Sequence, residues 1–513
     1  MKYKIEDFKV IVSDLRDLKL IIQEKLKINK FEYKIYHKSI DARDKENVLY
    51  NYKLIIDTKE HIKFKHVQIY KDEEIKINYP KWHNPSPLIV GFGPSGMFSA
   101  LYLARCGANP IIIERGSRIE KRIKDVLDFT LNHKFNPESN VSYGEGGAGT
   151  FSDGKLTTNL NDPYIRFILN ELYKHGANEN IIYDNKPHIG TDILREVVKN
   201  IREEIISLGG KFYFDTFFYD YEEKNNELIV YCKGENNNIS FKTKNLILGL
   251  GHFAKETIQM LYDKGFEIMP KAFSMGFRVE HKRIDINKMQ YGKFHEYLPA
   301  AYYKLQTHHE NRGIYTFCMC PGGYVIPSNA YENHITINGM SENKRDNINS
   351  NSALLVDVRP DDITGDSPLK GIRFQEYYEK KSFDFTNSYK APGNLFKEFL
   401  NNEIAKKERN IKTTYPFGIA FSDFKGLLPD FVIDEAKYGI LEFDKKMKGF
   451  NDPDAIILGV ESRSSSAIRI LRNKNYMAKN MVYPIGEGAG YAGGIVSSAL
   501  DGLKCGVSIV ENQ

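Results

Sequence analysis

The sequence has few cysteines, a single tryptophan and almost no excess of charge. Five cysteines, an odd number spread over 513 residues, do not suggest the framework of a disulfide-rich secreted protein. The 72 basic and 67 acidic side chains leave a net charge of +5, too small to predict a polyanionic partner. No segment approaches the roughly 20 apolar residues of a membrane helix, and the start, MKYKIEDFKV, lacks the apolar stretch of a signal peptide. We therefore expect a cytoplasmic, globular protein with no membrane partner.

The length and the pattern of the chain predict several domains. A chain of 513 residues is too long for one hydrophobic core and suggests roughly two to four domains. Residues 1–80 read as a small α+β unit with strands at 2–12, 32–40 and 48–58 and a helix near 14–28. This unit holds 18 basic and 14 acidic side chains, for which a solvated lysine-rich face is the favoured reading. The segment NYPKWHNPSP, with three prolines, ends the unit.

A short strand, a glycine turn and a helix follow this linker. The stretch PLIVGFGPSG contains Gly91, Gly93 and Gly96 at the spacing G-x-G-x-x-G, between a strand at 88–90 and a helix at 94–106. A second buried strand, PIIIE, ends in Glu114, 21 residues after Gly93. In a βαβ unit these glycines allow a tight turn, a close approach of the backbone to a pyrophosphate and close helix packing, and the acid binds a ribose. The sequence therefore predicts a dinucleotide site.

The rest of the chain favours FAD over NAD. After Glu114 we expect about 45 irregular residues, then a helix at 191–208, a strand KFYFDTFF, a polar β-meander and an apolar strand NLILGLGH. This order resembles the FAD-binding half of the glutathione-reductase-like flavoproteins. Near the end, YPIGEGAGYAGGIVSSALDGLKC places Glu487 between glycines ahead of an apolar helix. In such flavoproteins the acid binds the ribityl hydroxyls, and the positive helix N-terminus faces the flavin.

Several motifs carry a resemblance to one family. GFGPSG, GEGGAGTFSDGKL, KPHIGTD, YTFCMCPGG, GVESRSSSAIRI and GEGAGYAGGI occur in this order. Together they resemble the uncharacterised bacterial FAD-dependent dehydrogenases over nearly the whole chain, and more distantly the geranylgeranyl-reductase-like flavoproteins. One departure is Phe253, where many relatives carry a serine, and this puts a hydroxyl contact there in doubt.

The expected FAD contacts come from four segments. The loop from Gly144 to Lys155 has five glycines, an entropic cost that favours a backbone cradle for the flavin over a plain solvent loop. We expect the cofactor contacts to be Gly91, Gly93, Pro94, Ser95, Gly96, Glu114, Arg115, Arg122, Gly146, Gly147, Thr150, Ser152, Lys155, Gly251, Gly486, Glu487, Gly494 and Ile495.

Cys318 and Cys320 leave two alternatives open. Beside a flavin they could act as a redox pair or attack a substrate. On a regular strand the C-x-C spacing points both thiols to one face, and a disulfide between them would be strained. Two buried small side chains are the favoured reading, and no metal is expected because a second cysteine pair is absent.

Other candidates lie in KPHIGTD and GVESRSSSAIRI. The sequence leaves open whether Lys186 and His188 face the flavin. Thr191 or Asp192 is expected to cap the next helix. Glu461, Arg463 and Arg469 would hold an acidic substrate or form a structural ion pair. The candidate catalytic residues are Cys318, Cys320, Arg463 and His188.

These features predict an α/β fold with a Rossmann-like FAD-binding domain of glutathione-reductase type, a β-meander, an inserted α+β substrate domain and a small N-terminal α+β domain. The expected ranges are 1–80 for the N-terminal domain, 86–267 and 451–513 for the FAD domain, and 268–450 for the substrate domain, with a polar excursion at 341–413.

The predicted function is an FAD-dependent oxidoreductase that transfers a hydride between bound flavin and a small organic substrate. No second dinucleotide domain is visible, so NADH or NADPH, as a diffusible reductant, would share the substrate cleft. The alternatives are a flavoprotein that acts on RNA through the basic N-terminal unit, as some tRNA-modifying enzymes of this fold do, and a flavin-bearing sensor without turnover.

Overall fold

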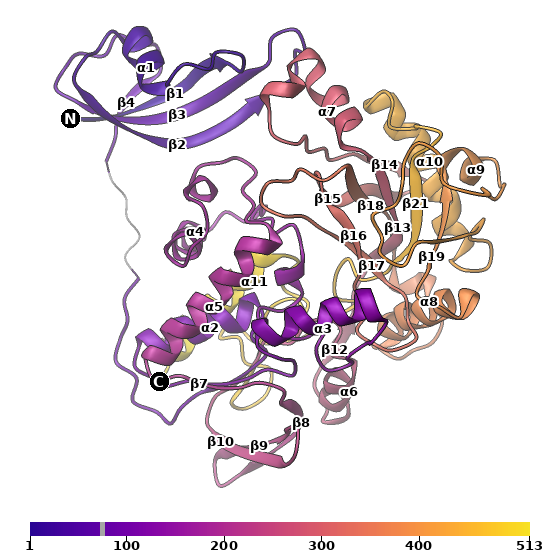
Figure 1. Cartoon of the computed structure of the whole chain (residues 1–513). Coiled ribbons are helices and arrows are strands. Elements are labelled where there is room, and N and C mark those ends of the chain that lie inside the picture. Colours follow the sequence, from indigo (N-terminus) through magenta and orange to yellow (C-terminus); the bar gives the residue numbers. More distant parts are fainter. Residues whose placement is uncertain (72–76) are drawn as a thin grey trace.

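The computed structural model describes residues 1–71 and 77–513 (Figure 1). Residues 72–76, which fall within the expected N-terminal domain, lie outside the described residues. No helix in the described ranges is long and apolar enough to cross a membrane.

The N-terminal unit is a four-stranded antiparallel sheet with one helix, as expected (indigo in Figure 1). Its order is β2-β3-β1-β4, and Ile21, Ile22 and Leu26 of the helix pack on the sheet. The elements are β1 (Lys2–Ile11), α1 (Leu18–Leu26), β2 (Phe31–Asp41), β3 (Leu49–Thr58) and β4 (Val67–Ile69). The predicted periods of two and 3.6 are therefore confirmed in this unit.

A five-stranded parallel sheet carries both glycine motifs. Its order is β23-β11-β5-β6-β7, with β5 (Leu88–Val90), β6 (Ile111–Ile113), β7 (Lys211–Tyr213), β11 (Leu246–Leu248) and β23 (Val482–Pro484). Ile89, Ile112 and Ile247 pack against α2 (Pro94–Arg105), α5 (Thr191–Ser207) and α11 (Ile495–Glu511). Because all strand pairs are parallel, the chain leaves β5, β6, β11 and β23 at the same edge of the sheet.

The opposite face of this sheet meets the expected β-meander. Its strands are β8 (Phe217–Lys224), β9 (Glu227–Lys233) and β10 (Asn238–Thr243), in the order β10-β9-β8. The segment KFYFDTFF is two strands rather than one, because the chain turns at Asp215, which has a φ of 50°. β7 completes the parallel sheet and β8 begins the meander.

The stretch after Glu114 was expected to be irregular, and this prediction is wrong. It contains α3 (Ile119–Asn132), and α4 (Tyr164–Lys174) follows the glycine loop. Ile119 and Phe129 of α3 are buried, so an apolar stripe at helical spacing was present in the sequence. The many glycines that follow it hid this signal.

A seven-stranded mixed sheet forms the second large body (reddish pink through orange to gold in Figure 1). Its order is β14-β15-β18-β13-β21-β19-β20. The strands are β13 (Phe273–Lys282), β14 (Gln306–His309), β15 (Arg312–Cys320), β18 (Asn349–Val358), β19 (Ala391–Leu395), β20 (Ile419–Phe421) and β21 (Ile456–Glu461). The expected polar excursion at 341–413 is therefore wrong in part, since β18 lies inside the sheet and is almost wholly buried.

Helices and two strand pairs complete this second body. α8 (Lys370–Thr386) and α10 (Asp430–Lys446) pack on the sheet. The body also contains α7 (Arg283–Tyr291), α9 (Phe396–Leu400), the pair β16 (Tyr324–Pro327) and β17 (Ile337–Met340), and the pair β12 (Ile268–Pro270) and β22 (Ile468–Ile470). The helix α6 (Lys255–Asp263) instead packs on β8 of the meander. β12 and β22 lie where the chain passes between the two bodies.

Candidate functional site

A cavity of about 540 Å³ lies at the edge where the parallel strands end. Residues from β15 and β21 of the large sheet and from β17 of the pair β16–β17 close its far side. Of the residues expected to contact the cofactor, the cavity is lined by Gly91, Gly93, Pro94, Ser95, Glu114, Arg115, Gly147, Ser152, Lys155, Gly251, Glu487, Gly494 and Ile495. Gly96, Arg122, Gly146, Thr150 and Gly486 do not line it.

The first glycine turn is built for close backbone approach. Gly91 has a φ of 92°, and a Cβ there would overlap the carbonyl oxygen of Gly249 at the end of β11. A Cβ on Gly96 would overlap the carbonyl oxygen of Gly91, which is why Gly96 matters although it does not face the cavity. Gly93 is the N-cap of α2 and Pro94 its first residue. The first-turn N–H groups of α2, which have no partner within the helix, are available to an anion at this point.

Glu114 joins the turn to the glycine loop. Its carboxylate accepts hydrogen bonds from the backbone N–H groups of Phe92 (2.9 Å), Gly116 (3.0 Å) and Gly144 (3.0 Å). A carboxylate has about four acceptor sites, so one remains for a ligand in the cavity. Glu114 therefore holds the two halves of the cradle together as well as facing the cavity.

Arg115 and Arg122 have different roles. The Arg115 guanidinium lies 4.4 Å from the ring centroid of Tyr143 and 4.6 Å from that of Phe217, at the cavity wall. Arg122 is fully buried and donates to the backbone carbonyls of Asn140, Val141, Glu145 and Gly147. Burial lowers the pKa of Arg122 to about 10. Arg122 thus fixes the glycine loop from behind.

The glycine loop presents some of its residues to the cavity and others to the core. Gly147, Ser152 and Lys155 line the cavity, whereas a Cβ on Gly146 would overlap the hydroxyl of Thr150. Thr191, expected to cap α5, instead donates its hydroxyl to the carbonyl of Thr150 at 2.7 Å.

The cap prediction for α5 is wrong, because Gly190 is the N-cap and no side chain caps the helix. Asp192 accepts a hydrogen bond from the backbone N–H of Asn343 instead. Both side chains tie α5 to neighbouring segments.

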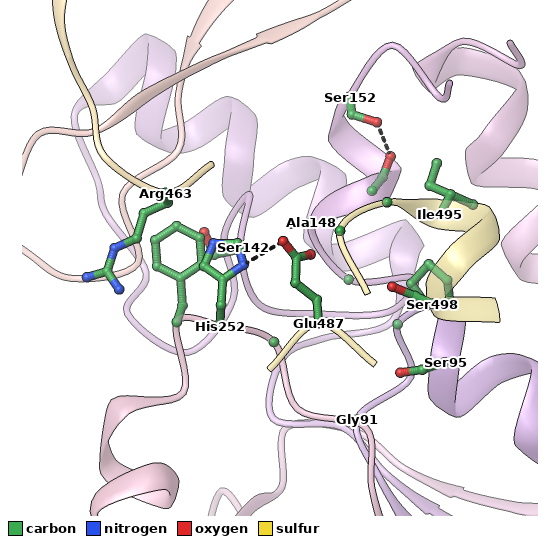
Figure 2. A pocket seen from close by; sticks show the side chains of 18 of the residues that line it. Gly91, Ser95, Ser142, Ala148, Ser152, His252, Arg463, Glu487, Ile495 and Ser498 are labelled. Carbon is green, nitrogen blue, oxygen red and sulfur yellow. Dashed lines mark hydrogen bonds and ion pairs between the residues drawn. The ribbon is translucent and has the colours of Figure 1, made fainter. Parts of the chain in front are cut away.

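The second helix N-terminus meets the same cavity. Gly493, Gly494, Ile495, Ser497 and Ser498 at the start of α11 line it. In Figure 2 Glu487 points toward His252, and Ile495 and Ser498 lie on the other side of Glu487. The Nδ1 of His252 is 3.2 Å from a carboxylate oxygen of Glu487. A Cβ on Gly486 would lie 2.5 Å from the hydroxyl of Ser95, so Gly486 lets the two motifs pack together.

The cysteine pair lies on a β-bulge. The register of β15 against β18 shifts between Phe317 and Cys320, and Cys318 has a φ of 44°. The regular alternation of a strand, which would point both thiols to the same face, is therefore interrupted. Cys318 lines the cavity, while Cys320 is fully buried and burial raises its pKa to about 12. All five cysteines are free thiols.

Two buried ion pairs lie beside the cavity. Arg463 lines it, yet its guanidinium is held by Glu379, with Nε 2.6 Å from a carboxylate oxygen. Glu461 also lines it, with an oxygen 3.3 Å from Arg278 Nη1. Arg469 donates to the carbonyl of Gly490. The structural ion pair that the sequence left open for Arg463 is thus present.

His188 and Lys186 lie behind the cavity wall. His188 Nε2 is 3.1 Å from the carbonyl of Asn343, and burial, together with Arg345, lowers its pKa to about 4. The Lys186 ammonium lies 4.2 Å from the ring centroid of Tyr302. Neither residue lines the cavity itself.

Sequence reasoning missed several lining residues. They include His252, Tyr302, Lys304, Thr316 and Asn338. His252 had a signal, because it follows an apolar strand that ends in Gly-x-Gly. Thr316 comes from β15 of the large sheet, Asn338 from β17, and Tyr302 and Lys304 from the segment before β14. Tertiary packing brings them to the cavity, and the local pattern gave no indication of it.

One cluster away from the cavity has ligand atoms at metal-like spacing. Glu171, His175 and Glu204 each offer an atom within 4.8 Å of the others. Arg105 occupies both carboxylates, with nitrogen–oxygen distances of 2.6 and 2.7 Å. The cluster is therefore accounted for as an ion-pair network among side chains.

Comparison with known proteins decides the family. Residues 272–464 match the family model described as FAD-dependent protein, C-terminal domain-like. A Clostridium beijerinckii protein described as uncharacterized is 41% identical over 530 residues, which span 97% of this chain and 96% of that one. The chain belongs to this FAD-dependent protein family. The expected resemblance and the flavoprotein class are thereby confirmed.

Two solved flavoprotein-like structures are also similar to this flavoprotein. A geranylgeranyl bacteriochlorophyll reductase-like protein from Thermoplasma acidophilum is 12% identical, with 83% of this chain and 79% of that chain covered and a TM-score of 0.37. A flavoprotein/dehydrogenase from Cytophaga hutchinsonii is 12% identical, with 83% and 78% covered and a TM-score of 0.33.

Proposed function

We propose that the cavity holds FAD in the manner of glutathione-reductase-type proteins. The observation that carries this proposal is that the N-termini of α2 and α11 both line one cavity at the carboxyl edge of a parallel sheet. The donor set suits the cofactor: the backbone N–H groups of Ser95 and Gly96 for a pyrophosphate and a spare acceptor on Glu114 for a ribose. Arg115, which lies over the rings of Tyr143 and Phe217, supplies a cation at the cavity wall for the adenosine end.

The flavin end of the cofactor would lie toward α11. The positive end of the α11 dipole stabilises negative charge at its N-terminus, and Glu487 with His252 offers an acceptor and a donor beside it. Lys155 and Cys318 close the opposite wall. Bound FAD supplies hydride transfer, which the protein side chains alone cannot perform.

We infer an FAD-dependent oxidoreductase acting on a small organic substrate. Residues 86–267 and 451–513 would form the FAD domain, 268–450 the substrate domain and 1–80 a separate N-terminal domain. Cys318 and Arg463 are the catalytic candidates that line the cavity, whereas Cys320 and His188 would act only through neighbours. A nicotinamide donor would have to reach the flavin through this same cavity.

The direct test is the visible spectrum of the purified protein, recorded anaerobically before and after addition of NADH or NADPH. A bound-flavin spectrum that bleaches identifies a nicotinamide-linked reductase. A flavin that stays oxidised points to a dehydrogenase whose own substrate is the reductant. A protein that neither carries FAD nor binds added FAD refutes the proposal.

One variant tests whether the adenosine half of FAD binds beside Glu114. Glu114→Gln replaces a carboxylate that accepts three backbone hydrogen bonds by an amide that cannot accept them all. We expect FAD binding to weaken about tenfold or more, with FMN, which lacks the adenosine half, much less affected. Equal loss for FAD and FMN would contradict the assigned orientation.

The RNA alternative gains no support from the described relatives, whose names mention no nucleic acid. Its test is salt-sensitive RNA binding that disappears when residues 1–80 are deleted.

A further inference from the structure

One end of the cavity differs from the rest in its charge. We call it the Tyr302 end, formed by Lys155, Tyr302, Lys304, Cys318 and Glu461. Lys304 is two residues after Tyr302, and contacts join the other four. The Lys155 ammonium donates to the carbonyl of Met319 and lies 5.6 Å from the ring centroid of Tyr302. On the other side, the carbonyl of Cys318 accepts from Arg278 at 2.8 Å, and Arg278 faces Glu461.

Positive charge exceeds negative charge at this end. Asp153 is shared by Lys155, at 3.8 Å, and Arg345, at 2.5 Å, so one carboxylate faces two cations. These cations hold the pKa of Asp153 at about 2 in spite of its burial. Lys304 lines the cavity with no ion pair to any residue in 1–71 or 77–513. The Tyr302 end therefore has a surplus of cations, which suits an anionic ligand.

Glu461 is the group at this end that can gain or lose a proton near neutral pH. It is only 3% exposed, and both of its oxygens lie near Arg278 Nη1, Oε1 at 3.5 Å and Oε2 at 3.3 Å. The Oε2 contact lacks hydrogen-bond geometry, and no other described residue bonds to this oxygen. Its partner Arg278 is 3.3 Å away and also bonds to Cys318 and Asn338, so the pair is loose. Burial raises the pKa of Glu461 to about 7, although Arg278 and Lys155 act in the opposite direction.

We propose that the Tyr302 end binds a small organic carboxylate together with a proton, which the Glu461 carboxyl group holds. An anion that enters beside an ionised Glu461 would face a like charge at low dielectric, whereas the neutral acid donates a hydrogen bond to it. Binding to the ionised form is then coupled to uptake of one proton from water, and release of the anion returns it. The inference deepens the proposed function and rests on it for the role of the carboxylate as redox partner of the flavin.

The groups around Glu461 leave it as the titrating one. Arg278 on β13 and Lys155 on the glycine loop stay charged, and the Cys320 thiol on β15 has a pKa of about 12. Cys318 on β15 also lies nearby, and Arg463 beyond β21 is paired with Glu379. His188, behind the wall, is neutral above about pH 4.

The test is calorimetric binding of benzoate to the full-length protein, in two buffers of different ionisation enthalpy. At about pH 8 we expect uptake of a large fraction of one proton, and near pH 5.5, where Glu461 already carries a proton, almost none. The dissociation constant should rise by up to tenfold per pH unit above about pH 7. Binding without proton uptake at pH 8, or no binding of benzoate, acetate or oxalate at either pH, overturns the proposal.

Three variants locate the effect. Glu461→Gln should bind benzoate with no proton uptake and a flat pH profile. Glu280→Gln is the matched control and should behave as the wild type. Glu280 is also buried, on β13 and outside the cavity, and its oxygens accept hydrogen bonds from Thr413, Thr414 and Asn349. The exposed Lys304→Ala, which poses little risk to folding, should weaken binding at least threefold and leave the proton uptake unchanged. A Glu461→Gln profile identical to wild type refutes the assignment.

The two proposals fail separately. Benzoate binding linked to Glu461 in a protein that takes up no FAD would keep the anion site and refute the flavin function. Bound FAD, together with benzoate binding that is independent of Glu461, would support the flavin function and refute the role of Glu461 in the anion site.

Discussion

Replacing Gly502 with alanine should separate α11 from α2 and weaken cofactor binding. Gly502 lies in the middle of α11, and a Cβ there would overlap the carbonyl oxygen of Ser95 and lie 2.6 Å from its carbonyl carbon. Ser95 belongs to the first turn of α2, at the cavity. The contact therefore fixes the middle of α11 against the N-terminal turn of α2, the two helices that we assign to FAD binding.

The magnitude follows from the opposing effects of an added methyl group. Carbon atoms pack at about 3.5–4.0 Å, so the helices must move apart by roughly 1 Å. Overpacking of this kind costs about 1–3 kcal/mol, while alanine in place of a helical glycine gains about 1 kcal/mol. Because the obstacle is backbone, which cannot rotate away, we expect net destabilisation and an FAD dissociation constant raised about tenfold or more.

Gly506→Ala is the matched control on the same helix, one turn later. Its Cβ would meet a ring carbon of Tyr102 at 3.2 Å and Ser99 atoms at 3.6 Å, which small side-chain shifts can relieve. This variant should keep FAD affinity and gain up to about 1 kcal/mol of helix stability. The assay is thermal unfolding and fluorescence titration of apoprotein with FAD. If Gly502→Ala binds FAD as tightly as Gly506→Ala and is as stable, the close approach does not organise the site.

Three further predictions follow from buried groups. Arg463→Met should destabilise the protein by about 3–5 kcal/mol in thermal or denaturant unfolding, because Glu379 would be left buried and unpaired. The double variant Arg463→Met with Glu379→Gln should recover much of this loss. Equal stability of the single and double variants would contradict the prediction. Burial raises the pKa of Glu145 to about 7 from its usual 4.5, so its contribution to stability is full below pH 4.5 and is lost as the pH rises through about 7. The loss is at most about 3 kcal/mol, and Glu145→Gln should flatten this part of the stability–pH profile, whereas an unchanged slope would show that the group is ionised throughout. Cys318 should react with iodoacetamide before the four buried thiols, Cys106, Cys232, Cys320 and Cys505, and added FAD should slow this reaction. Mass spectrometry of the alkylated peptides checks both points. Early labelling of any buried thiol would contradict the exposure of Cys318 at the cavity.

Local chemistry made the first half of the site readable from the sequence. The turn at Gly91, Gly93 and Gly96 and the acid at Glu114 need particular residue types at fixed spacings, because backbone contact and hydrogen bonding act over short distances. The same holds for Glu487 and the glycines before α11. Helix α3 shows the limit, since its apolar stripe was overlooked beside a glycine-rich loop.

Strand pairing across the chain accounts for what local patterns missed. Cys318, Asn338 and Glu461 are brought to one cavity by β15, β17 and β21, and Lys304 reaches it from the segment before β14. The bulge that separates Cys318 from Cys320 depends on the register against β18, which neither cysteine encodes locally.

The sequence by itself thus determined the glycine turns, the acids beside them and the family, because each rests on residues close together in the chain. Only the tertiary structure decided which side chains face the cavity and which support it from behind. Arg122 and Glu461 illustrate the difference: both are buried ionisable side chains, and their pKa values and roles come from groups that are not their neighbours in sequence. Burial and long-range pairing set those environments, and they exist only once the chain has folded.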